Sequence, residues 1–109
     1  MARLNMAQVQ ELKEIMEDAF DDLISTYIQD SQDKLKLLSK ANFDQNADVL
    51  GTLGHSLKGS SLNICAEDLS AIFKQIEDAG RSNDLSSVTQ LLIQANAEFE
   101  AVKTALYAL

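Results

Sequence analysis

The apolar residues of this chain recur every three or four positions, the spacing that places side chains on one face of an α-helix. A short helix is expected over residues 6–16, followed by four longer amphipathic segments. Their apolar stripes are Phe20, Leu23, Ile24, Tyr27, Ile28, Leu35 and Leu38; Leu50, Leu53, Leu57, Ser61 and Ile64; Leu69, Ile72, Phe73, Ile76 and Ala79; and Leu85, Val88, Leu92, Ala95, Phe99, Val102 and Leu106. In the short helix, Met6 and Met16 are expected to pack onto the rest.

Short breaks at 41–46, 64–68 and 80–84 separate the long stripes. Asp44 or Asn46 is suited to cap the helix after the first break. In the last break, Gly80 is expected to end one helix, and an aspartate or asparagine at 83–84 to cap the next. Because short connections place neighbouring helices antiparallel, the pattern predicts an all-α, up-down four-helix bundle with an additional short N-terminal helix.

The length and composition agree with a single domain. The chain has 109 residues, no proline and 46% hydrophobic residues, enough to bury one core. We expect one domain over 1–109, with the N-terminal helix in 1–17 and the four-helix bundle in 18–109. The fourth long stripe is needed inside the bundle, so a monomer is expected.

Charge and targeting signals narrow the class of partner. Nine basic against seventeen acidic residues give a net charge of −8, which disfavours nucleic acids and anionic membranes as partners. The start of the chain lacks the apolar run of a signal peptide, and no stretch of about twenty apolar residues could span a bilayer. The single cysteine excludes an internal disulfide. We therefore expect a cytoplasmic protein.

One stretch breaks the rules of a helix built only for stability. Gly51, Gly54 and Gly59 lie within nine residues of a helical pattern. Each costs about 1 kcal/mol relative to alanine. Gly54 is best explained by close helix packing. From 49 to 66 the only charged residue is Lys58. Local inconsistency of this kind often marks a functional site.

The only histidine, His55, lies in the middle of this stretch. Its direction differs from the core positions Leu53 and Leu57 by about 200°, so it should face solvent. Gly51, Gly59 and Leu62 are expected on the same exposed face, with Lys58 beside it. Glycines there let another macromolecule approach, and an exposed leucine favours docking. Single surface histidines, lysines and leucines without a role are also common.

The chemistry open to His55 is limited by what surrounds it in sequence. A metal site needs several converging ligands, and no second histidine exists. Neither a nucleophile-elbow motif nor a phosphate-binding loop is present. The imidazole itself remains as a nucleophile that could accept a phosphoryl group, with Lys58 offsetting the added charge.

Residues 55–61, His-Ser-Leu-Lys-Gly-Ser-Ser, resemble the signature of histidine phosphotransfer (HPt) domains of multistep phosphorelays, and the resemblance covers most of 18–109. The pair Cys65-Ala66 departs from it, because the family usually has Gly-Ala there. If that glycine takes a positive φ, either the cysteine is strained or the helix ends differently. Cys65 itself is expected to be a small buried residue and not a nucleophile, because nothing cationic or basic adjoins it in sequence.

The resemblance implies that His55 accepts a phosphoryl group from an aspartyl phosphate on a receiver domain, as in a hybrid sensor kinase, and passes it to the receiver aspartate of a response regulator. Lys58 would stabilise the phosphoryl oxygens, and Gly59 would give the phosphoryl group and the receiver room. Glu77 would accept a hydrogen bond from Nδ1 and leave Nε2 as the nucleophile. The residues expected to contact the receiver are Gly51, Ser56 and Leu62.

The resemblance implies no cofactor or metal on this chain, since Mg²⁺ belongs to the receiver. It also implies no ATP-dependent kinase activity. A non-catalytic helical-bundle adaptor, binding a signalling partner through the same face, stays open as the alternative. A histidine kinase fragment is disfavoured, because kinase helices are usually followed by an ATP-binding domain and this chain ends.

Overall fold

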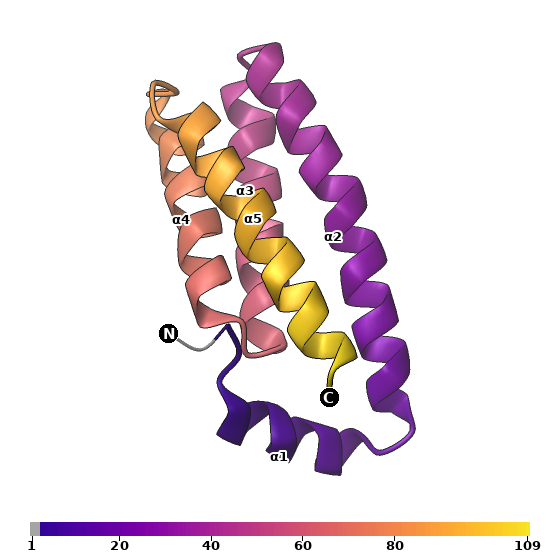
Figure 1. Ribbon diagram of the computed structural model, residues 1–109. Coiled ribbons are helices and arrows are strands. Elements are labelled where there is room, and N and C mark those ends of the chain that lie inside the picture. Colours follow the sequence, from indigo (N-terminus) through magenta and orange to yellow (C-terminus); the bar gives the residue numbers. More distant parts are fainter. Residues whose placement is uncertain (1–2) are drawn as a thin grey trace.

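The structure is a computed structural model that describes residues 3–109, and within that range it is all-helical (Figure 1). The elements are α1 (Met6–Met16), α2 (Ala19–Phe43), α3 (Ala47–Asn63), α4 (Glu67–Ser82) and α5 (Val88–Tyr107). The all-α prediction is confirmed.

Helices α2 to α5 run alternately up and down, and α1 lies across one end of the bundle that they form (Figure 1). Helix α3 packs between α2 and α4, and α5 closes the bundle against α4 and α2. The predicted four-helix bundle with a short N-terminal helix is confirmed. The contact between α3 and α4 is the most extensive of these, and it carries the site described below.

The core contains the four predicted stripes, whose members are buried or partly buried throughout. Leu23, Leu53, Ile72 and Leu85 are the partly buried members, at the edges of the core. Apolar side chains spaced three and four residues apart along each helix therefore meet at the axis of the bundle, as amphipathic helices require. Burial of these stripes fixes the rotation of α3 and so the direction in which its remaining side chains point.

The N-terminus of α3 is capped as the sequence indicates. The side-chain oxygen of Asn46 accepts a hydrogen bond from the backbone N–H of Val49 at 3.2 Å. This satisfies one of the free N–H groups of the first turn. Of the two candidates, Asn46 is the cap, while Asp44 is the residue at which α2 ends.

The predicted end of α4 at Gly80 is wrong. The helix continues to Ser82, and Asn83 ends it in the left-handed conformation with φ 56°. Asparagine tolerates this conformation, so no glycine is required. Gly80 is instead an interior residue of α4, where it is buried against α3.

The predicted start of the last helix is also too early. Helix α5 begins at Val88 and is preceded by Ser87, without a side-chain cap. Asp84 does not cap it, because its Oδ1 accepts from the backbone N–H and hydroxyl of Ser86 in a local turn. Leu85 thus belongs to the connection, although it still packs against the core.

Helix α1 is attached to the bundle by few side chains. Val9 is buried, and Leu12 and Met16 are partly buried against the core. Met6 is 47% exposed, so its predicted packing role is wrong. Val9, one turn later, occupies the contact with the bundle instead.

Candidate functional site

His55 lies in the middle of α3 and points out of the bundle, with 63% of its side chain exposed. The predicted exposure of the imidazole is confirmed. The core residue Leu57 lies on the opposite side of the helix and is fully buried. An imidazole in this position is accessible to another macromolecule.

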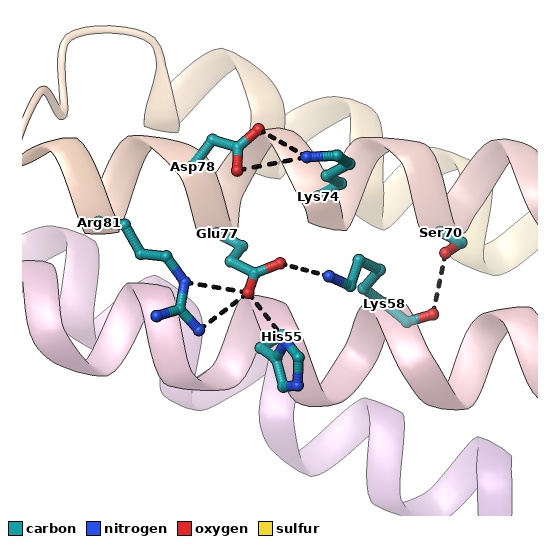
Figure 2. Close-up of polar contacts among 7 residues, drawn as sticks. All are labelled: His55, Lys58, Ser70, Lys74, Glu77, Asp78 and Arg81. Atoms are coloured by element: carbon teal, nitrogen blue, oxygen red, sulfur yellow. Dashed lines mark hydrogen bonds and ion pairs between the residues drawn. The ribbon is translucent and has the colours of Figure 1, made fainter.

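Glu77 on α4 reaches across to this imidazole, and the side chain of Glu77 is only 7% exposed. Its Oε2 lies 2.8 Å from His55 Nδ1. An ionised carboxylate only accepts hydrogen bonds, so Nδ1 carries the proton and donates it. Figure 2 shows the second ring nitrogen directed away from Glu77. The contact between Glu77 and Nδ1 that the resemblance implies is present in the structure.

Two cations bind the same carboxylate (Figure 2). Lys58 Nζ donates to Oε1 at 2.7 Å. Arg81 donates to Oε2 through Nε at 3.0 Å, and its Nη2 lies 2.9 Å from the same oxygen. The Lys58 hydrogen bond above all, with those of Arg81 and His55, outweighs the effect of burial and lowers the pKa of Glu77 to about 2. The carboxylate is therefore ionised at neutral pH.

The cluster has a local charge opposite to that of the whole chain. Lys58 and Arg81 contribute +2 and Glu77 contributes −1, which gives +1 with a neutral imidazole. The chain carries −8 overall. A local excess of positive charge beside an exposed nucleophile favours an anionic group at this position.

Arg81 is not among the residues predicted for the site, because it falls in the break expected at 80–84. It lies four residues after Glu77 on the same helix, the spacing at which a carboxylate and a cation meet. That spacing was visible in the sequence. The expected end of α4 at Gly80 hides this pairing, because it places Arg81 outside the helix that carries Glu77.

Glycines let α3 and α4 approach closely enough for this cluster to form. A Cβ on Gly54 would lie 2.8 Å from the backbone nitrogen of Glu77, and a Cβ on Gly80 would lie 2.5 Å from that of Gly51. No side chain larger than hydrogen fits either position without a shift of the backbone. The expected packing role of Gly54 is confirmed.

The predicted exposure of Gly51 is wrong. It is buried where α4 crosses α3, and a Cβ there would be 3.5 Å from the Cγ of Arg81. Gly51 faces nearly the same way as His55, as the spacing predicts, but α4 covers this position. Gly51 is therefore not part of the exposed surface around His55. Gly59 is open, because a Cβ added there would meet nothing within 4 Å.

The other two expected docking residues lie at different depths. Leu62 is 57% exposed, two turns after His55. Ser56 is half-buried at the border with α2, where its hydroxyl accepts from Lys34 Nζ at 2.7 Å. Lys34 also pairs with Asp30 at 3.0 Å. Leu62 is available to a partner, whereas Ser56 joins α3 to α2.

Cys65 adopts the conformation that glycine favours. Its φ is 68°, in the loop between α3 and α4, and its side chain is buried. Its carbonyl accepts from the backbone N–H of Asn5 at 2.8 Å, which connects this loop to the start of α1. Burial, with the nearby charge of Glu67, raises the pKa of the Cys65 thiol, so it is a poor nucleophile. Cys65 lies ten residues after His55, which is more than two helical turns, and the ion cluster is intact.

Comparisons with known proteins show the family to which the chain belongs. The Hpt domain family model matches residues 22–105. The crystal structure of histidine-containing phosphotransfer protein B (HptB) from Pseudomonas aeruginosa PAO1 is similar, with a TM-score of 0.94 and 30% sequence identity over 97% of this chain and 92% of that chain. No curated protein sequence matched. The chain belongs to the Hpt domain family, whose members carry phosphoryl groups in phosphorelays.

None of the helices within residues 3–109 is both long enough and apolar enough to cross a membrane.

Proposed function

We propose that His55 accepts a phosphoryl group from the aspartyl phosphate of a receiver domain and passes it to the aspartate of another receiver. The observation that carries this assignment is the single exposed imidazole whose Nδ1 is bonded to a buried carboxylate. Because Nδ1 holds the proton, Nε2 has the free electron pair and is the nucleophile. The family membership of the chain supports this assignment.

Lys58 is proposed to stabilise the phosphoryl oxygens. Its ammonium group has three N–H donors, and one of them is bound to Glu77. The remaining donors stay available next to the ring, on the same helix and one turn after His55. A charge-assisted hydrogen bond to an equatorial oxygen would offset the charge that the phosphoryl group brings.

The receiver is proposed to dock on the exposed face of α3. Gly59, one turn after His55, presents bare backbone to it, and Leu62 presents an apolar side chain. The receiver would supply the Mg²⁺ and most of the catalysis, so this chain supplies a positioned nucleophile and needs no cofactor. A monomeric cytoplasmic carrier fits this role, and size-exclusion chromatography with light scattering tests the monomer.

The test is phosphorylation by a small donor. Purified protein is incubated with phosphoramidate and analysed by intact mass spectrometry, beside His55→Gln. Thr52→Ala, an exposed change one turn earlier, serves as the matched control. The expected result is one acid-labile, base-stable phosphoryl group on the wild type and on Thr52→Ala, and none on His55→Gln.

A folded His55→Gln variant that still gains the group would contradict the assignment. The adaptor alternative differs in its prediction for signalling. An adaptor keeps its output in His55→Gln, whereas a carrier loses it while remaining folded, as judged by circular dichroism.

A further inference from the structure

The Glu77 carboxylate contacts the imidazole of His55 at Nδ1, whereas the proposed reaction takes place at Nε2. Glu77 Oε2 is 2.8 Å from Nδ1, and the carboxylate is almost entirely shielded from water. An amide oxygen or a backbone carbonyl would orient the ring equally well. A carboxylate adds a full negative charge, which stabilises a positive charge on the ring.

We propose, on the basis of His55 as the phosphoryl acceptor, that the Glu77 carboxylate retains the proton on Nδ1 throughout the phosphoryl cycle. His55 then accepts and releases the group without a proton leaving the ring. Glu77 is a positioning residue in this scheme, since it acts through His55 and not on the phosphoryl group.

The accepting step balances without proton transfer. The Nε2 electron pair forms a bond to phosphorus, and the bond from phosphorus to the aspartyl oxygen breaks. The receiver carboxylate leaves with that electron pair. The ring, with phosphorus on Nε2 and hydrogen on Nδ1, now carries a positive charge, which lies against the negative charge of Glu77.

The releasing step is the reverse with a second carboxylate. An oxygen of the receiver aspartate bonds to phosphorus, the bond to Nε2 breaks, and its electron pair returns to the ring. Because Nδ1 has kept its proton, the leaving group is a neutral imidazole. If Nδ1 lost the proton to solvent, the leaving group would be an imidazolide anion, which departs far more slowly.

Other charged groups also face His55, from α4, α3 and α2. Arg81 on α4 and Lys58 on α3 oppose a positive ring, but both donate to the carboxylate and hold it ionised. Both also reach water, which screens their charges. From α2, Lys34 and Asp30 form a neutral pair that meets α3 at Ser56. The buried charge bonded directly to the ring is that of Glu77.

The variant Glu77→Gln separates charge from orientation. Its side-chain oxygen can accept the same hydrogen bond from Nδ1, but it carries no charge. The matched control is Asp78→Asn, at the next residue along α4. Asp78 is exposed and pairs with Lys74 at a distance of 3.2 Å, and this pair points away from His55 (Figure 2). This variant removes the same charge from the same helix without touching the ring.

The experiment measures how fast the phosphoryl group is lost as pH is changed. Wild type, Glu77→Gln and Asp78→Asn are loaded with phosphoramidate, freed of donor, and followed by ³¹P NMR from about pH 5 to about pH 9. A ring protonated at Nδ1 loses the phosphoryl group quickly. In the wild type and Asp78→Asn, this fast loss should persist to higher pH. Near pH 8, Glu77→Gln should lose the group about tenfold more slowly.

Coincident pH profiles for the wild type and Glu77→Gln would overturn the inference, as would a rate lowered by the same factor at every pH, which reports lost orientation only. Either result leaves His55 as the acceptor. Absence of phosphohistidine from the wild type would instead contradict the proposed function and the inference together. Circular dichroism confirms that each variant is folded.

Discussion

Helix α3 has two neighbours, and it meets them in different ways. Against α4, Gly54 and Gly80 bring the backbones so close that neither has room for a Cβ. Against α2, ordinary side chains fill the contact, and Tyr27 and Ser61 share a buried hydrogen bond of 2.8 Å. The close side carries the ion cluster, and the ordinary side secures the bundle. Close backbone approach here serves the site, because it brings Glu77 within reach of His55.

The largest expected effect follows from the charge on the close side. The pKa of Glu77 is about 2 in the folded protein, against an ordinary value of 4.5. A carboxyl whose pKa is lowered stabilises the fold above the ordinary value, and this stability is lost as pH falls from about 5 toward 2. The full contribution is roughly 3 kcal/mol, of which about 2 kcal/mol should be lost by about pH 3.

Urea unfolding at about pH 5 and about pH 3 measures this loss. Glu77→Gln should lack that part of the pH dependence, and the exposed control Asp78→Asn should keep it. Equal pH dependence in Glu77→Gln and the wild type would show that the ion cluster does not stabilise the fold.

A methyl group placed in the close contact should separate the helices. In Gly80→Ala the new Cβ would start 2.5 Å from a backbone nitrogen and 2.7 Å from the carbonyl oxygen of Ala47. Overpacking should lower the free energy of unfolding by about 3 kcal/mol, and the higher helix propensity of alanine should raise it by about 1 kcal/mol. The net destabilisation is therefore about 2 kcal/mol. Thermal unfolding measures the loss of stability, and phosphorylation by phosphoramidate should slow as Glu77 moves from His55. An unchanged melting temperature would mean that the helices are not held this close.

On the ordinary side, loss of a hydrogen bond should affect stability alone. Tyr27→Phe leaves the buried Ser61 hydroxyl without its partner, which should cost about 1 kcal/mol. The phosphorylation rate should stay at the wild-type value. A double-mutant cycle with Ser61→Ala, followed by urea unfolding, isolates the pair. A slowed phosphorylation in Tyr27→Phe would remove the distinction between the two sides of α3.

The smallest effect, and one of opposite sign, is expected on the exposed face. Gly59→Ala meets nothing within 4 Å and replaces a helix-interior glycine, so it should stabilise the fold by up to ~1 kcal/mol. Phosphorylation by phosphoramidate should be unaffected. Transfer from a receiver domain should slow, because the methyl group occupies the proposed docking surface. Destabilisation on thermal unfolding would show that Gly59, like Gly80, lies in a packed contact.

The sequence alone was sufficient for the fold and for part of the site. Periodicity identified the helices, because burial of each stripe determines the rotation of its helix. The same reasoning placed His55 toward solvent. The contact with Glu77 came from the family resemblance, since residues on separate helices have no periodic relation.

The predictions that failed at the site concern residues at the crossing of α3 and α4. Gly51 has the direction of an exposed residue, but α4 covers it. Gly80 has the pattern of a helix end, yet it lies in the close contact with α3, and Asn83 takes the left-handed conformation instead. Arg81 becomes meaningful only once α4 is known to continue past Gly80. Distances between helices depend on both partners, and no single-helix pattern contains them.

The most direct test of the account is a nitrogen-resolved NMR spectrum of the imidazole. His55 is the only histidine, so ¹⁵N labelling gives one ring to assign before and after phosphoramidate treatment. We expect a proton on Nδ1 in both states and phosphorus on Nε2 in the second. Phosphorus on Nδ1, or an Nδ1 that carries no proton before treatment, would contradict it.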